Sequence, residues 1–147
     1  MQTFLPYADF FMSAASLDTK RLGKQRVECL QLLNSLTGRT TGRGWANHPA
    51  REMWRPYVQA LVEYGIVVCM EWRKRGYNDT CLEKISSFKD GTSVVYPWWI
   101  GDEKFHNSHK SNLLRKNLEY YSRYWPDMED THPYIWPVNS TKTFKII

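Results

Sequence analysis

The chain has 147 residues, a length typical of one domain, and 42% of them are hydrophobic and 24% charged. This composition excludes a disordered or fibrous protein. No apolar stretch approaches the roughly 20 residues that span a membrane. The first 15 residues contain Asp9 and no basic lead-in, which argues against a signal peptide. The cysteines, Cys29, Cys69 and Cys81, match neither a disulfide framework nor a zinc motif, so we expect a cytoplasmic protein without a membrane partner.

The net charge of +5 is unevenly distributed along the chain. Residues 1–75 hold 11 Lys or Arg and 6 Asp or Glu, whereas residues 76–147 hold 9 of each. All the excess positive charge therefore lies in the first half, ahead of an aromatic-rich second half. A basic face favours a polyanionic partner such as nucleic acid, and charge that only keeps the protein in solution is an equal alternative.

Apolar periodicity, caps and breakers predict a mainly helical protein. In chain order, we expect helices over residues 7–15, 18–36 with a stop at Gly38, 49 to a break at Pro56, 57–75 with a stop at Gly76, 102–116 and 118–125. Residues 78–96 are expected to be loop with at most a short extended stretch at 93–96, and residues 139–147 a loose tail or an edge strand. The predicted fold class is all-α: a compact single-domain helical bundle over residues 1–147, with long irregular loops.

Glycine stands out at two places. Gly23 lies inside the helix expected over residues 18–36, where it costs about 1 kcal/mol relative to alanine. Close approach of another element or of a ligand would explain it. Residues 38–47 form a loop rich in glycine and arginine that lacks the features of a phosphate-binding P-loop. Its amides beside Arg39 and Arg43 could meet phosphates, or the segment could be a plain connector.

The helix over residues 18–36 also holds the most informative charges. Arg21 and Lys24 precede Glu28 by seven and four residues, so the three share one face, and Arg26 lies near the same end. We expect the surrounded carboxylate to stay ionised, because nearby opposite charges favour the charged form. Such an anion is useful where a positive sugar centre develops, as when an N-glycosidic bond breaks. The alternative is a surface ladder of weak ion pairs.

Histidines and aromatic residues supply further candidates. His106 and His109 lie three residues apart, and no second motif supplies the other ligands of a metal, so we expect no metal and instead histidines that form hydrogen bonds or face a phosphate. His48, next to Pro49, is either a helix cap or part of an active site. The Tyr-Tyr-Ser-Arg-Tyr-Trp run at residues 120–125 could stack on bases, although at least half of these rings must be core.

For covalent chemistry, an amine is the more natural candidate than a thiol or a hydroxyl. No Ser-His-Asp or Gly-x-Ser-x-Gly pattern is visible, and Cys29 and Cys69 lie in apolar helical contexts that indicate packing. Lysines or the α-amino group could form a Schiff base with an aldehyde. The α-amino group has the lower intrinsic pKa, about 8, so more of it is neutral and nucleophilic.

Motifs in a fixed order run through roughly the first 80 residues: LDTK at 17–20, RVECL at 26–30, GWANHP at 44–49 and KRGYN at 74–78. In this order they resemble the pyrimidine-dimer DNA glycosylase family, the endonuclease V type that acts on ultraviolet lesions. The second half looks like a divergent, less characterised branch of such proteins. The resemblance implies a compact all-helical fold.

The resemblance also implies a DNA N-glycosylase with abasic-site lyase activity and no cofactor. In that family the N-terminal α-amine attacks C1′ of the sugar and forms an imine, while a helix-borne glutamate stabilises the charged sugar and assists proton transfers. The matching residues here are Met1 as nucleophile and Glu28 as acid–base residue, with His48 near the site. The expected partner of this monomer is damaged or modified double-stranded DNA, with contacts from Arg21, Lys24, Arg26, Arg43, His109 and Arg115.

This sequence departs from the family pattern in two ways. The best-known phage enzyme exposes a small residue after losing its methionine, whereas Gln2 is bulky, so we expect Met1 to be retained. The arginines around Glu28 are also spaced differently. A damaged or modified pyrimidine is the expected target. Two alternatives remain open: an N-glycosidase on the same scaffold that acts on a nucleotide, and a non-catalytic DNA-binding protein.

Overall fold

The computed structural model describes residues 2–39 and 47–147. Its elements are α1 (Phe10–Ser16), α2 (Thr19–Leu36), α3 (Pro49–Trp54), the 3₁₀ turn η2 (Arg55–Tyr57), α4 (Val58–Lys74), α5 (Leu82–Ser86), α6 (Glu103–Lys116), α7 (Leu118–Tyr121), β1 (Ile135–Val138) and β2 (Thr143–Ile146). The prediction of a mainly helical protein is confirmed. The strict all-α label is not, because β1 and β2 pair as an antiparallel hairpin, with Ile135 opposite Ile146.

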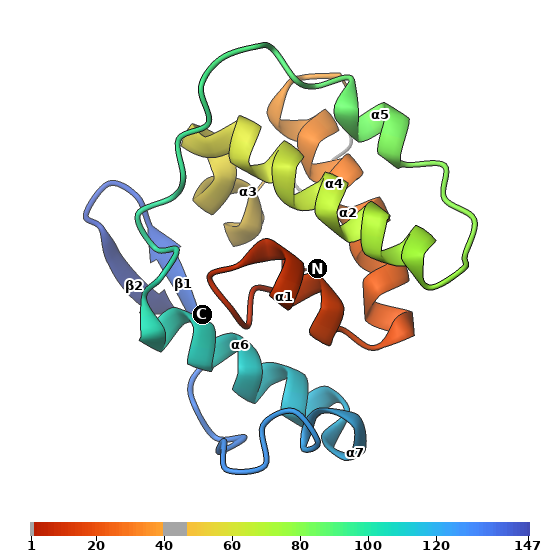
Figure 1. Ribbon diagram of the computed structural model, residues 1–147. Coiled ribbons are helices and arrows are strands. Elements are labelled where there is room, and N and C mark those ends of the chain that lie inside the picture. Colours follow the sequence, from red (N-terminus) through yellow and green to blue (C-terminus); the bar gives the residue numbers. More distant parts are fainter. Residues whose placement is uncertain (1, 40–46) are drawn as a thin grey trace.

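Helix α4 is the centre of the upper layer in Figure 1, where it packs against α1, α2 and α5. The contact between α2 and α4 explains Gly23, because a Cβ atom there would lie 2.8 Å from the Trp72 ring. Gly65 of α4 likewise allows a close approach of α5, since a Cβ atom added there would lie 3.1 Å from Ile85. Of the two explanations expected for Gly23, close approach of another element is therefore confirmed.

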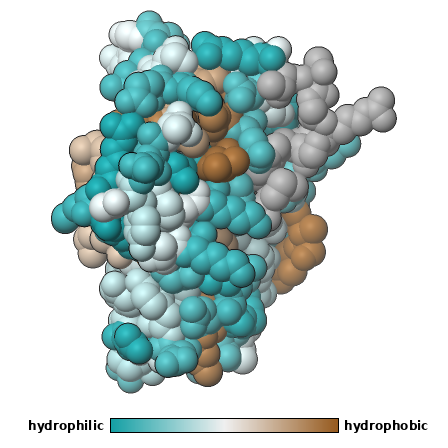
Figure 2. Space-filling model, turned by 90° about the vertical axis from the view of Figure 1, so that its right-hand side faces the viewer, coloured by the Kyte–Doolittle hydropathy of each residue, from teal (hydrophilic) through white to brown (hydrophobic). Residues whose placement is uncertain are grey.

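Helices α6 and α7 lie on the opposite side of α1 from α2 and α4, and the hairpin lies beside them (Figure 1). The core fills the space between these layers and contains several large rings, among them Trp54, Trp99 and Phe105. On the face shown in Figure 2, hydrophilic side chains predominate and hydrophobic ones lie in separate small groups. None of the helices in the two described ranges is long and apolar enough to cross a membrane.

Local signals account for several helix ends. Asp9 and Asp102 cap α1 and α6 by accepting from the N–H groups of Met12 and Lys104. Helices α2 and α4 end as expected at Gly38 and Gly76, which have the positive φ values of 74° and 93°.

Other parts of the second half differ from the sequence prediction. Helix α5 was not expected in the 78–96 segment; it forms because Asp79 accepts from the N–H groups of Cys81 and Leu82, and because Ile85 packs on Gly65. Residues 93–96 form no strand. Of the two alternatives for residues 139–147, the edge strand is confirmed over Thr143–Ile146.

Candidate active site

Residues 2–5 run in an extended path through the interior of the protein. Side chains of neighbouring helices, rather than a neighbouring strand, form the hydrogen bonds to their backbone. The N–H of Gln2 donates to Glu28 Oε2 at 3.0 Å, and the N–H of Phe4 donates to Gln25 Oε1 at 2.7 Å. Gln25 Nε2 in turn donates to the carbonyl of Gln2 at 2.6 Å. Because buried backbone groups must find partners, α2 fixes the path of this segment through two polar residues three positions apart.

Two histidines of α6 bind the backbone of Leu5 from the side opposite α2. The N–H of Leu5 donates to His109 Nδ1 at 2.9 Å, and its carbonyl lies 2.7 Å from His106 Nδ1. The N–H of Gly101 donates to His106 Nε2 at 2.9 Å, so His106 carries its proton on Nδ1 and donates to Leu5. His109 must then carry its proton on Nε2. Burial lowers the pKa of His106, and it lowers the pKa of His109 to about 3, so both rings are neutral near pH 7.

This arrangement corrects one predicted DNA contact. His109 has no exposed surface and its Nδ1 is occupied by Leu5, so the ring cannot reach a phosphate. The alternative of a histidine that forms structural hydrogen bonds is the one that the structure shows. Among residues 2–39 and 47–147, no group of three or more His, Cys, Asp or Glu side chains could hold a metal ion.

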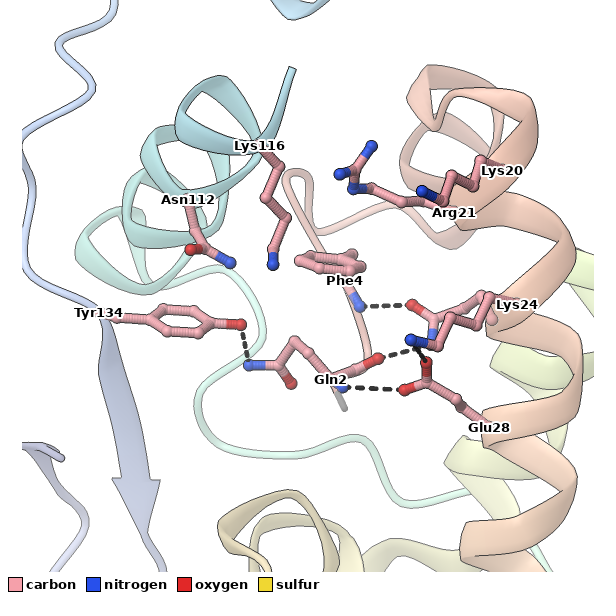
Figure 3. A pocket seen from close by; sticks show the side chains of 10 residues that line it. Gln2, Phe4, Lys20, Arg21, Lys24, Glu28, Asn112, Lys116 and Tyr134 are labelled. Atoms are coloured by element: carbon pink, nitrogen blue, oxygen red, sulfur yellow. Dashed lines mark hydrogen bonds and ion pairs between the residues drawn. The ribbon is translucent and has the colours of Figure 1, made fainter. Parts of the chain in front are cut away.

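A cavity of about 470 Å³ lies between α2 and α6, with the N-terminal segment as its floor (Figure 3). The two helices face each other across it, and their side chains point inward. Its lining consists of Lys20, Arg21, Lys24, Gln25 and Glu28 from α2, Asn112 and Lys116 from α6, and Gln2, Phe4 and Tyr134.

The Glu28 carboxylate is held firmly at the edge of this cavity. It is 7% exposed, accepts from the N–H of Gln2 through one oxygen, and lies 3.8 Å from Lys24 Nζ through the other. Arg21, also in the lining, pairs with Asp18 at 3.1 Å. A fixed carboxylate among cations can stabilise a positive centre that develops beside it and can accept a proton from it. The structure thus brings together Arg21, Lys24 and Glu28, as their spacing on one helix face predicted.

Gln2 connects the two sides of the floor. Its backbone N–H is bonded to Glu28, and its side-chain amide donates from Nε2 to the Tyr134 hydroxyl. Burial raises the pKa of Tyr134 above its usual value, against the opposing effect of hydrogen bonds from Gln2 and Asn112. The phenol is therefore neutral near pH 7.

Arg26, another predicted DNA contact, does not line the cavity. Its Nη1 lies 2.5 Å from Asp79 Oδ1, and its guanidinium lies 4.5 Å from the centre of the Trp72 ring. Burial acts to raise the pKa of Asp79, but hydrogen bonds from Cys81, Arg26 and Leu82 outweigh it, and the pKa lies below its usual value. Only 14% of the Arg26 side chain is exposed, so this arginine serves the packing of α2 on α4.

The remaining predicted residues lie away from the cavity or outside the described ranges. His48 caps α3, because its Nδ1 accepts from the N–H of Ala50 at 3.1 Å, and burial lowers its pKa. It does not line the cavity. Exposed Arg115 donates to the carbonyls of Asp130 and His132, and a DNA contact there stays a prediction. Met1 and Arg43 lie outside the residues that the structure describes.

The aromatic run at residues 120–125 is largely structural. Tyr121 is wholly buried and its hydroxyl donates to Asp18, which also donates to it from the backbone at 3.0 Å. Trp125 is buried and stacks on Tyr121 with centroids 5.4 Å apart. Tyr124 is 46% exposed. The interpretation of these rings as part of the core is therefore confirmed for Tyr121 and Trp125.

Sequence reasoning did not select several of the lining residues, namely Gln2, Phe4, Lys20, Gln25, Asn112, Lys116 and Tyr134. One of them left a usable signal. Gln25 stands between Leu22 and Cys29 in the buried stripe of α2, and a polar residue at such a position needs a specific partner. Asn112 and Lys116 of α6 gave no comparable signal, because a spacing of four residues is common on any helix face.

Comparison with protein families gives one match. A family model described as pyrimidine dimer DNA glycosylase matches residues 1–84. The matched part includes the whole α2 side of the cavity, with Glu28, and ends before α6. Comparison with curated proteins and with solved structures found no match. The family description is that of an enzyme that acts on DNA. Because the match covers more than half of the chain, this protein belongs to the pyrimidine dimer DNA glycosylase family.

Proposed function

We propose that this protein is a DNA N-glycosylase with abasic-site lyase activity, which removes a damaged or modified pyrimidine through an amine–imine intermediate. Family membership supports the glycosylase step. The observation that carries the proposal is the position of Glu28, a nearly buried carboxylate at a cation-lined cavity that holds the peptide nitrogen of Gln2 at 3.0 Å.

In the proposed reaction an amine attacks C1′ of the deoxyribose. The C1′–N bond breaks and the base leaves with the bonding electrons. The C1′–O4′ bond then opens, O4′ takes the proton that the attacking nitrogen gives up, and the nitrogen forms a protonated imine with C1′. Glu28 stabilises the positive sugar and then accepts a proton from C2′, and the C3′–O bond breaks to release the strand with its phosphate. The geometry favours this role because Glu28 is fixed before substrate arrives.

Two amines are candidates for the nucleophile. The first is the α-amine of Met1, which is proposed because Met1 is bonded to the nitrogen that Glu28 holds. The second is the nitrogen of Gln2 itself, which would become the α-amine if Met1 were removed, and which lies 3.0 Å from Glu28 Oε2. The chain end in the active protein decides between them.

Borohydride trapping on abasic DNA tests the proposal. A covalent adduct should form, and mass spectrometry of the adduct should place it on the amino-terminal residue, whether that is Met1 or Gln2. An adduct confined to a lysine would remove the α-amine from the mechanism. Absence of an adduct together with normal base release would leave a glycosylase without lyase activity.

The size of the cavity favours one alternative substrate. A volume of about 470 Å³ falls within the range of small-molecule sites, roughly 300–1,000 Å³. A pyrimidine nucleoside or nucleotide could enter it without DNA. Release of free base from monomers at a rate equal to or above that from lesion-containing duplexes would favour this alternative, and no release from either would favour a non-catalytic DNA-binding protein.

A further inference from the structure

The α6 side of the cavity lies outside the part of the chain that the family model matches. Asn112 and Lys116 are four residues apart, on one face of α6, and both point into the cavity between α6 and α2 (Figure 3). The residues that perform the proposed chemistry and the residues that face them thus come from different parts of the sequence. The residues on the α6 side can therefore determine which substrate the cavity binds without changing the residues that perform the proposed chemistry.

The cations that line the cavity differ in how their charges are compensated. Arg21 is paired with Asp18, and Lys24 lies near Glu28. Within the described residues, neither Lys20 on α2 nor Lys116 on α6 has a carboxylate within ion-pair distance. Two uncompensated ammonium groups therefore stand on opposite walls, and a phosphate is the group that would compensate them.

The interior between these lysines suits a base. The Phe4 ring lies between the two walls and offers an apolar surface (Figure 3). Asn112 supplies an amide with both a hydrogen-bond donor and an acceptor, and it lines the cavity beside the partly buried Tyr134. A space of about 470 Å³ holds one nucleotide rather than a duplex, so the target must leave the base stack to enter.

We propose that Asn112 and Lys116 are substrate-selecting residues: Lys116 binds a phosphate that flanks a displaced nucleotide, and Asn112 hydrogen-bonds the edge of its base. The inference rests on the proposed function, because it assigns a strand of DNA to the same cavity. It adds that residues after 84 choose the substrate, while α2 supplies the reacting carboxylate.

A binding experiment tests the role of Lys116 without any chemistry. The probe is a duplex with a tetrahydrofuran abasic analogue, which lacks the C1′ oxygen and cannot form an imine. Lys116→Ala should weaken binding about five- to tenfold at 0.1 M salt and reduce the slope of log affinity against log salt by about one. Lys104→Ala is the matched control, because it removes the same charge from α6 about 18 Å away along the axis, at 1.5 Å per residue.

The outcomes separate this inference from the proposed function. Equal affinity and equal salt slope for Lys116→Ala and Lys104→Ala would overturn the role of Lys116, and so would a wild-type protein that does not bind the duplex. Failure to release any base from lesion-containing DNA would reject the proposed function instead, whatever the binding result.

A kinetic experiment tests Asn112. Asn112→Ala should raise KM and change the ratio of rates on two different damaged pyrimidines, while kcat on the better substrate falls less than threefold. Asn107→Ala, on another face of α6, is the control and should preserve the ratio. An unchanged ratio in Asn112→Ala, with the helical circular dichroism of wild type, would overturn its role in base recognition.

Discussion

His106 and His109, one turn apart on α6, hold the two backbone groups of Leu5 as opposite tautomers, one as donor and the other as acceptor. The two histidines form the hydrogen bonds to Leu5 that a neighbouring strand would otherwise form. Leu5 lies where the N-terminal segment passes from α2 to α6. Because a protonated ring cannot accept the Leu5 N–H, the floor of the cavity depends on a neutral His109.

Acid should destabilise the protein between about pH 6.5 and 3. The pKa of His109 is about 3 in the folded state, against about 6.5 in the unfolded chain, so the unfolded state binds the extra proton. The contribution of the neutral His109 ring to the free energy of unfolding is therefore complete above pH 6.5. It is lost as pH falls, by up to about 1.4 kcal/mol per pH unit. Urea unfolding at pH 7 and 5 measures a loss of roughly 2 kcal/mol from this group.

His109→Asn should flatten that dependence, because its amide oxygen can accept the Leu5 N–H and does not titrate. His132→Asn serves as the control for loss of an imidazole elsewhere. An unchanged difference between pH 7 and 5 in His109→Asn would show that the ring is not the titrating group.

Glu28→Gln should abolish base release while DNA affinity stays within about threefold of wild type. The substitution keeps an acceptor for the Gln2 N–H and removes the negative charge, and the loss of one such electrostatic group lowers kcat by roughly 10²–10³-fold. Single-turnover kinetics and fluorescence anisotropy measure the two quantities. Glu119→Gln, at an exposed position of α7, is the control, and full activity of Glu28→Gln would reject the assignment.

Gln25→Leu should lower the free energy of unfolding by about 2–4 kcal/mol, because it leaves the Phe4 N–H and the Gln2 carbonyl buried without partners. Lys20→Leu, at an exposed position of the same helix, should cost less than about 0.5 kcal/mol. Urea denaturation gives both values. A loss in Gln25→Leu no larger than in the control would mean that the N-terminal segment does not depend on this clamp.

Gly23→Ala should destabilise the protein by about 1–3 kcal/mol despite the better helix propensity of alanine, since the added methyl would meet the Trp72 ring at 2.8 Å. The same substitution in a Trp72→Leu background should cost little or become favourable. A double-mutant cycle with thermal or urea unfolding measures the coupling. Equal costs in the two backgrounds would contradict a direct clash.

The sequence by itself determined the helical architecture, the stops at Gly38 and Gly76, and the position of Arg21, Lys24 and Glu28 on one helix face. These features depend on local periodicity and on residues within one or two helical turns, which is the range that a sequence pattern reports. For Gly23 the sequence indicated close approach of either another element or a ligand, because a glycine inside a helix needs a reason that lies outside the helix, and the structure decided for α4.

Only the tertiary structure decided which polar residues face the cavity. Arg26 and Lys24 carry the same positive charge, yet Arg26 is paired with Asp79 and Lys24 lies beside Glu28. Lys116 lies far along the chain from α2, and His109 is buried by its contact with Leu5. Burial and pairing arise from segments that meet only after folding, so the same residue type can bind a ligand or hold the core, and no local pattern separates the two roles.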